Sequence, residues 1–126
     1  MINGESGQSI IVGATPNPGR YAFIAAEMLE DTNHPFIPLG IKRGEVLGQE
    51  ILDIREQPEI QDVHTLTLYV GSRNLEPYHD YLLSLQPKRI IFNPGAENPE
   101  LYQRAQAAGI EVVNACTLVM IRSDQY

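Results

Sequence analysis

The chain has 126 residues, the length of one ordinary domain, and we expect residues 1–126 to form a single domain. Hydrophobic residues make up 43% and charged residues 20% of the chain, so it can bury a core and is not a disordered tail. Sixteen acidic against nine basic residues give a net charge of −7. A surface of this sign repels a phosphate backbone, which disfavours nucleic acid as a partner.

The cysteine count and the hydropathy of the chain indicate the cellular compartment of the protein. Cys116 is the single cysteine, so no intramolecular disulfide can form, and no charged-then-apolar leader precedes the first apolar run. The longest apolar stretches are about five residues, against roughly 20 for a membrane-spanning helix. We therefore expect a cytoplasmic protein that has no membrane as partner. A homodimer is left open.

Five strands are predicted along the chain. Residues 10–14 form a short continuous apolar run with a glycine near its end, as in a strand buried on both faces. Leu66 and Leu68 alternate with threonines, which predicts that their strand has one more exposed face and lies nearer an edge of the sheet. Residues 45–62 show no period, and we expect them to wrap the surface. The expected strands cover residues 10–14, 34–39, 64–70, 88–93 and 110–113.

Three helices are predicted between these strands. Residues 21–31 carry apolar side chains at the spacing of a one-sided helix. A second helix follows with Asn74 as N-cap and Pro87 as its stop. Asn98, followed by proline, predicts the start of a third helix, which Gly109 ends. The alternation of strands and helices predicts an α/β fold, with a mainly parallel sheet and helices on both faces.

Glycine and proline cluster in three segments that each follow a predicted strand, at residues 13–19, 38–44 and 93–99. In a doubly wound sheet, the loops beyond the carboxyl ends of the strands build the ligand site. We therefore expect these three loops to meet at one crevice.

The first of these loops has the position of a phosphate-binding loop. Gly13 and Gly19 allow close backbone approach, the helix N-terminus offers free N–H groups, and Arg20 adds a positive charge for a diphosphate. The sequence of this loop contains neither Gly-x-Gly-x-x-Gly nor a final Gly-Lys-Ser/Thr, so the NAD-type motif and the P-loop motif are both excluded. The alternative interpretation is a turn stiffened by proline that holds no ligand.

The next two loops carry further cations. Dinucleotide-binding domains normally have an acidic residue after the second strand, whereas this chain has Lys42 and Arg43 there. Two cations suit a phosphate on the sugar, as in NADP or coenzyme A, although two solvated surface charges explain them equally well in isolation. Gly71, Ser72 and Arg73 follow the third strand and are expected to face the same crevice.

No catalytic constellation emerges from the sequence. His34, His64 and His79 lie away from the predicted ligand loops and match no metal-ligand spacing. Cys116 could reach the crevice, but it has no histidine or cation nearby in sequence and is typical of an inert small residue. Residues 93–98 indicate mostly capping and turn chemistry. We expect neither a catalytic group nor a metal site.

Taken together, residues 13–20, 93–98 and 108–116 resemble the small stand-alone CoA-binding domain proteins. These proteins are similar to the CoA-binding domain at the N-terminus of the succinyl-CoA synthetase α-subunit. The resemblance covers nearly the whole chain, in the same element order. It implies a Rossmann-like, doubly wound, five-stranded parallel sheet in a three-layer α/β/α arrangement.

The resemblance also implies how the ligand is held. Residues 14–20 would hold the CoA diphosphate, residues 40–43 would approach the phosphorylated adenosine end, and residues 70–73 would border the nucleotide. The expected ligand contacts are Gly13, Ala14, Thr15, Pro16, Asn17, Gly19, Arg20, Tyr21, Gly40, Ile41, Lys42, Arg43, Val70, Gly71, Ser72 and Arg73.

The expected function is non-catalytic binding of coenzyme A or an acyl-CoA. One alternative is a Rossmann-like interaction or scaffold protein that holds no ligand and fills the crevice with its own side chains. Another is a subunit of an acyl-CoA ligase or transferase that needs a partner, because the resembling ligase also uses a domain with a phosphorylated histidine and a nucleotide-binding subunit.

Overall fold

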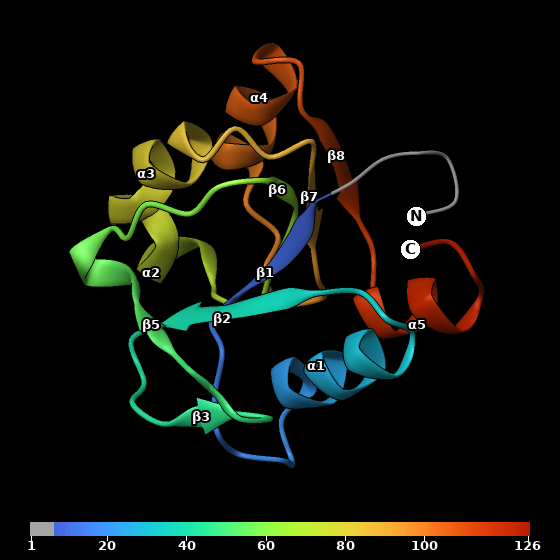
Figure 1. The fold of residues 1–126 in the computed structure, drawn as a ribbon. Helices are drawn as coiled ribbons and strands as arrows, with labels where there is room; N and C mark the ends of the chain where they lie inside the picture. The colour runs from blue at the N-terminus through green and yellow to red at the C-terminus, as the bar shows by residue number, and fades with distance from the viewer. Residues whose placement is uncertain (1–6) are drawn as a thin grey trace.

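The structure, a computed structural model, describes residues 7–126 and contains a central parallel sheet (Figure 1). Its six strands are hydrogen-bonded in the order β5-β2-β1-β6-β7-β8, and every neighbouring pair is parallel. The sheet strands are β1 (Gln8–Val12), β2 (Phe36–Gly40), β5 (Leu52–Asp53), β6 (Val63–Leu68), β7 (Arg89–Phe92) and β8 (Glu111–Asn114). A separate antiparallel hairpin pairs β3 (Glu45–Val46) with β4 (Gln49–Glu50).

Helices cover both faces of the sheet, with α1 and α5 on one side and α2, α3 and α4 on the other (Figure 1). Ile10 of β1 belongs to the hydrophobic cluster that includes Leu82 and Leu101. Its neighbour Ile11 belongs to a second cluster with Ala26, because successive strand residues face opposite sides. The helices are α1 (Tyr21–Asp31), α2 (Ser72–Leu75), α3 (His79–Ser84), α4 (Pro99–Ala107) and α5 (Thr117–Arg122), with 3₁₀ turns η1 (Ile54–Glu56) and η2 (Glu76–Tyr78).

The predicted Rossmann-like α/β fold is confirmed, and the five predicted strands all lie in the sheet. The strand count was wrong, because Leu52 and Asp53 pair with β2 and add a sixth strand at the edge. The expectation that residues 45–62 wrap the surface was wrong for part of this segment. Val46 and Ile51 are 1% and 7% exposed and belong to the hydrophobic cluster beneath α1. Two-residue strands are too short to show a period in the sequence.

The predicted edge position of the third strand was wrong, since β6 lies between β1 and β7 at the centre of the sheet. The alternating Thr65 and Thr67 are fully buried. Their hydroxyls are satisfied inside the protein, because Arg89 Nε donates to Thr65 Oγ1 and Thr67 Oγ1 shares a hydrogen bond with Thr117 Oγ1. Polar alternation therefore marks a buried hydroxyl layer here and not a solvated face.

The helix starts were predicted unequally well. Asn98 caps α4 as expected, with its Oδ1 accepting a hydrogen bond from the Leu101 N–H at 3.1 Å. Asn74 does not cap the second helix, because α2 begins at Ser72 and Gly71 has the N-cap position. This helical region is also split by η2, whose first turn contains proline. The short helix α5 was not predicted.

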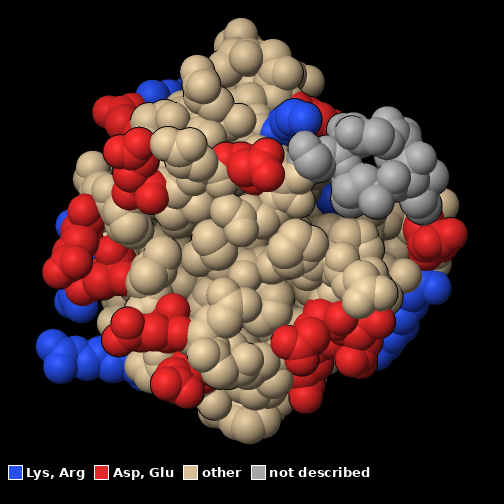
Figure 2. All heavy atoms as spheres, viewed as in Figure 1, with Lys and Arg blue, Asp and Glu red and all other residues tan. Residues whose placement is uncertain are grey.

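Charge and hydropathy can be followed on the surface. On the face shown in Figure 2, acidic side chains lie in several groups around the periphery, which agrees with the net charge of −7. Within residues 7–126, no helix combines the length and apolar character needed to cross a membrane.

Candidate ligand-binding site

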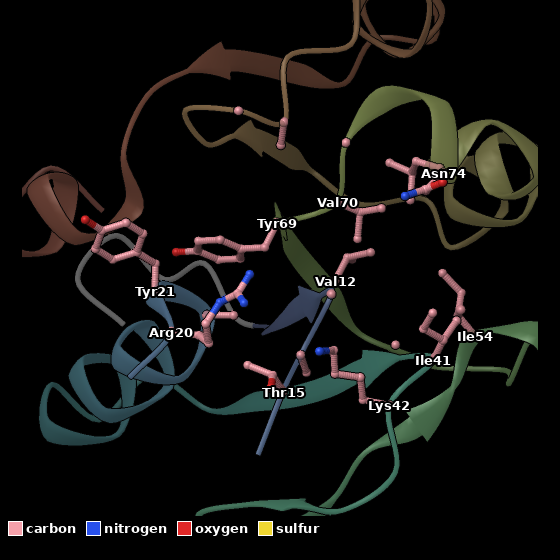
Figure 3. A pocket seen from close by; sticks show the side chains of 18 of the residues that line it. Val12, Thr15, Arg20, Tyr21, Ile41, Lys42, Ile54, Tyr69, Val70 and Asn74 are labelled. Carbon is pink, nitrogen blue, oxygen red and sulfur yellow. The ribbon is translucent and has the colours of Figure 1, made fainter. Parts of the chain in front are cut away.

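A cavity of about 530 Å³ opens at the carboxyl ends of β1, β2, β6 and β7, where the crevice was predicted (Figure 3). Because all these strands are parallel, the loops that follow them meet at one edge of the sheet. The cavity is lined by Val12, Gly13, Ala14, Thr15, Arg20, Tyr21, Ala22, Gly40, Ile41, Lys42, Ile54, Tyr69, Val70, Gly71, Asn74, Leu75, Tyr78, Pro94, Gly95 and Ala96.

Gly13 turns the chain sharply at the end of β1. Its φ is +95°, and a Cβ atom there would lie 2.7 Å from Val70 Cγ2, so both conformation and space require glycine. The N–H groups of Gly13 and Ala14 both donate to the Leu39 carbonyl, at 2.8 and 3.1 Å. These two N–H groups therefore fix the loop to β2, and the space beside Gly13 is taken by Val70 and by the backbone of Tyr69.

The N-terminus of α1 is left open at the cavity. Arg20 has the N-cap position in extended conformation and forms no side-chain cap, and no acidic residue lies in the first turn. Hydrogen bonds within the loop support this end, since the Gly19 N–H donates to Asn17 Oδ1 and the Asn17 N–H donates to Thr15 Oγ1. The first N–H groups of a helix lack acceptors within the helix, so this end can receive an anion.

Two cations from different loops point into the cavity. Figure 3 shows the side chains of Arg20 and Lys42 on opposite sides of Thr15, with the end of each side chain toward the space between them. Neither cation forms an ion pair with any residue in the range 7–126. Among residues 7–126, no aspartate or glutamate lines the cavity, so the charge that these residues bring to it is positive.

Arg43, the second cation expected in this loop, does not line the cavity. Its charge acts on Asp53 on β5. Hydrogen bonds from Arg55 hold the pKa of the Asp53 carboxyl below its usual range, and the charge of Arg43 adds a smaller effect in the same direction. Lys42 is therefore the residue that brings a charge from this loop to the cavity.

One side of the cavity is apolar and was missed by sequence reasoning. Ile54 comes from the segment expected to be irregular, and Leu75 and Tyr78 come from the split helical region after β6. Pro94 and Ala96 come from the loop that was expected to meet the crevice but to have mostly capping and turn roles. The glycine-proline cluster at residues 93–99 pointed to this loop, whereas no sequence signal placed Ile54 or Tyr78 at the site.

Tyr69 lies at the end of β6 with its hydroxyl buried. This hydroxyl has no hydrogen-bond partner within residues 7–126, and burial raises the pKa of the phenol to about 12. Figure 3 shows the ring beside the cavity, on the same side as Tyr21. Tyr69 therefore presents a neutral phenol at neutral pH.

The structure brings most of the expected contact residues together at this cavity. Those that line it are Gly13, Ala14, Thr15, Arg20, Tyr21, Gly40, Ile41, Lys42, Val70 and Gly71. Those that do not are Pro16, Asn17, Gly19, Arg43, Ser72 and Arg73, of which Ser72 and Arg73 begin α2 and the others lie on the same loops as the lining residues.

The residues set aside as non-catalytic lie elsewhere. None of the histidines lines the cavity, and His79 is buried between α3 and α4, where its Nε2 lies 3.0 Å from the Asn98 side-chain amide. Cys116 has the N-cap position of α5. Residues 7–126 contain no group of three histidine, cysteine, aspartate or glutamate side chains placed to hold a metal ion.

Comparisons with known proteins agree with this geometry. The family described as a CoA binding domain matches residues 8–122, and no curated protein matches the chain. A crystal structure of a protein described as uncharacterized is 48% identical, with a TM-score of 0.92, and the match covers 95% of this chain and 98% of that one.

Two more distant structures share the fold. A hypothetical protein from Pyrococcus horikoshii OT3 is 24% identical, with a TM-score of 0.79, over 94% of this chain and 83% of that chain. The dinucleotide-forming acetyl-coenzyme A synthetase 1 of Ca. Korarchaeum cryptofilum, in complex with phosphate and ADP, is 19% identical. Its TM-score is 0.64, over 88% of this chain and 26% of that chain. On the evidence of the match over residues 8–122, this chain belongs to the CoA-binding domain family.

Proposed function

We propose that the protein binds coenzyme A or an acyl-CoA non-covalently in this cavity. The observation that carries the proposal is the pairing of two cations from separate loops, Arg20 and Lys42, with an apolar wall and no carboxylate. CoA has a diphosphate, a ribose phosphate and extended uncharged parts, so its chemistry complements both sides of the cavity. Membership of the CoA-binding domain family supports the same ligand.

In this proposal the two cations contact different phosphates. Arg20 stands beside the open N-terminus of α1, and a helix end together with a guanidinium suits a diphosphate. Lys42 follows β2, where nucleotide-binding folds contact the adenosine ribose, so we assign it to the ribose phosphate. The apolar wall that includes Ile54 and Tyr78 would take an uncharged part of the ligand.

The proposal includes binding without catalysis. The residues that line the cavity include no histidine, cysteine or carboxylate to act as nucleophile or general base. Tyr69 does not supply a base, because burial raises the pKa of its phenol to about 12.

A scaffold protein without ligand would fill this crevice with its own side chains. Tyr21, which lines the cavity, is 70% exposed and does not fill it. Arg20 likewise borders the cavity without an acidic partner among residues 7–126. These features favour binding over the scaffold alternative.

Titration calorimetry of the purified protein with CoA, NADP and NAD tests the proposal. We expect saturable heat with CoA, and weaker or no heat with the two nicotinamide dinucleotides. Clear binding of a nicotinamide dinucleotide without binding of CoA would overturn the ligand assignment. The absence of heat with all three would favour the scaffold alternative.

A further inference from the structure

Lys42 lies on a four-residue loop, residues 41–44, whose two ends both contact the loop after β1. At the near end, Gly40 pairs with Asp53 of β5 and ends the β2 strand. A Cβ atom at Gly40 would lie 3.2 Å from the backbone nitrogen of Ala14 and 3.3 Å from its carbonyl oxygen. The backbone of Gly40 therefore packs directly on the loop that leads to Arg20.

The far end of this loop contacts Pro16. Gly44 has a φ of +136°, and a Cβ atom there would lie 3.0 Å from Pro16 Cγ and 3.1 Å from Pro16 Cβ. The Gly44 carbonyl accepts a hydrogen bond from the Ile51 N–H at 2.9 Å. Because Ile51 and Val46 are buried beneath α1, this end is anchored in the hydrophobic core.

A connection this short between two anchored ends has few conformations. Both anchors touch residues 14–16, and the same loop continues to Arg20. Lys42 lines the cavity and Arg43 does not, so Lys42 is the cation that this connection brings to the site. The backbone of Lys42 is thus constrained at both ends of the connection against the loop that leads to Arg20.

We propose that Gly44 is a positioning residue for ligand selection. By packing against Pro16, it holds Lys42 at the distance from Arg20 at which both cations reach a ligand with a diphosphate and a separate ribose phosphate. This inference rests on the proposed function and adds to it a residue that touches no ligand. It requires that Gly44 affect the preference for CoA over dephospho-CoA, which lacks the ribose phosphate.

The test compares Gly44→Ala with Gly48→Ala. Both glycines have positive φ, +136° and +87°, so alanine strains the backbone at either position. A Cβ atom at Gly48 meets nothing within 4 Å, whereas one at Gly44 meets Pro16. Gly48→Ala is therefore the matched control for backbone strain in the same hairpin. The readout is the ratio of the dissociation constants of dephospho-CoA and CoA, measured by calorimetry.

We expect the wild-type protein to prefer CoA by roughly tenfold to a hundredfold, the typical value of one charge-assisted contact. Gly44→Ala should reduce this ratio to within about threefold of unity, because a displaced Lys42 loses the contact that only CoA provides. Gly48→Ala should keep the wild-type ratio. In case Gly44→Ala does not fold, a glycine inserted between Arg43 and Gly44 lengthens the connection without adding a Cβ atom and should reduce the ratio equally.

The outcomes separate this inference from the proposed function. A wild-type protein that binds neither ligand would overturn the function itself. A wild-type protein that prefers CoA, with an unchanged ratio in Gly44→Ala or in the insertion variant, would overturn only the positioning role. Equal loss of the ratio in Gly44→Ala and Gly48→Ala would also overturn it, because strain in the hairpin would then explain the effect.

Discussion

The tripeptide Asn-Pro-Gly occurs twice in this chain, at residues 17–19 after β1 and at residues 93–95 after β7. Both copies lie at the carboxyl-end edge of the sheet, yet their asparagines have different surroundings. Asn17 is exposed, and its side chain accepts a hydrogen bond from the Gly19 N–H. Asn93 is 2% exposed, and its amide bonds to the Thr67 hydroxyl, the Leu68 carbonyl and the Thr117 N–H.

The helices that follow these two loops also differ in how their N-termini are capped. Asn98 caps α4 with its own side chain, and the Gly95 N–H of the same loop donates to Glu97 Oε1. The helix after the first loop, α1, has Arg20 in place of a capping side chain and opens on the cavity. The same tripeptide therefore stabilises the fold in the loop after β7. In the loop after β1 it leaves Arg20 and the N-terminus of α1 free to bind a ligand.

The largest effect expected from this comparison is on stability. Replacing Asn93 by alanine leaves the Thr117 N–H buried without its acceptor and removes two donated hydrogen bonds, so we expect a loss of about 3 kcal/mol in the free energy of unfolding. The melting temperature should fall by roughly 10 °C. The matched variant Asn17→Ala loses one exposed hydrogen bond and should cost less than about 1 kcal/mol. Equal losses in chemical unfolding would contradict the comparison.

The next effect is on binding. Arg20→Ala should lower the affinity for CoA by roughly tenfold to a hundredfold, because a charge-assisted hydrogen bond to the diphosphate is lost. The melting temperature should stay unchanged, since the Arg20 side chain has no ion-pair partner within residues 7–126. Arg73→Ala is the control, because Arg73 is an exposed cation that does not line the cavity. Calorimetry showing equal weakening in both variants would mean that overall charge, and not the first loop, governs affinity.

The smallest effect concerns the buried hydroxyl of Tyr69, which, unlike the Asn93 amide, has no hydrogen-bond partner within residues 7–126. Removing the unpartnered hydroxyl in Tyr69→Phe should change the free energy of unfolding at neutral pH by less than about 1 kcal/mol, with stabilisation the favoured direction. Because burial raises the Tyr69 pKa to about 12, the unfolded chain releases this proton first as the pH passes 10. Wild-type stability should therefore fall between about pH 10 and 12, and the variant should lose less. The free energy of unfolding can be measured in urea across this pH range. An equal decrease in the wild type and in Tyr69→Phe would contradict this prediction.

The parts of the fold that could be predicted are those with long periodic signals. The alternation of apolar runs and helical spacing predicts the five main strands and the helix at residues 21–31. The hairpin of β3 and β4 and the edge strand β5 could not be found, since two residues carry no period. The burial of Thr65 and Thr67 was missed because their partners, Arg89 and Thr117, are far away in the sequence.

The place of the site could be predicted from the order of strands and helices, but some of the residues that line it could not. The cavity is where loops after parallel strands must meet, and Arg20 and Lys42 both lie at it. Ile54 could not be predicted, because its segment shows no period, and Tyr78 lies in the predicted second helix, whose division by η2 the sequence did not show. The two Asn-Pro-Gly copies could not be told apart, because burial of Asn93 depends on contacts with β6 and with Thr117, which begins α5.

The most direct test of the account is the affinity of Lys42→Ala for CoA and for dephospho-CoA, with Arg20→Ala measured in parallel. If the two cations contact different phosphates of one ligand, Arg20→Ala should weaken both ligands. Lys42→Ala should weaken CoA by roughly tenfold to a hundredfold and leave dephospho-CoA almost unchanged. Equal weakening of both ligands in Lys42→Ala would contradict the assignment of this loop to the ribose phosphate, even in a protein that binds CoA.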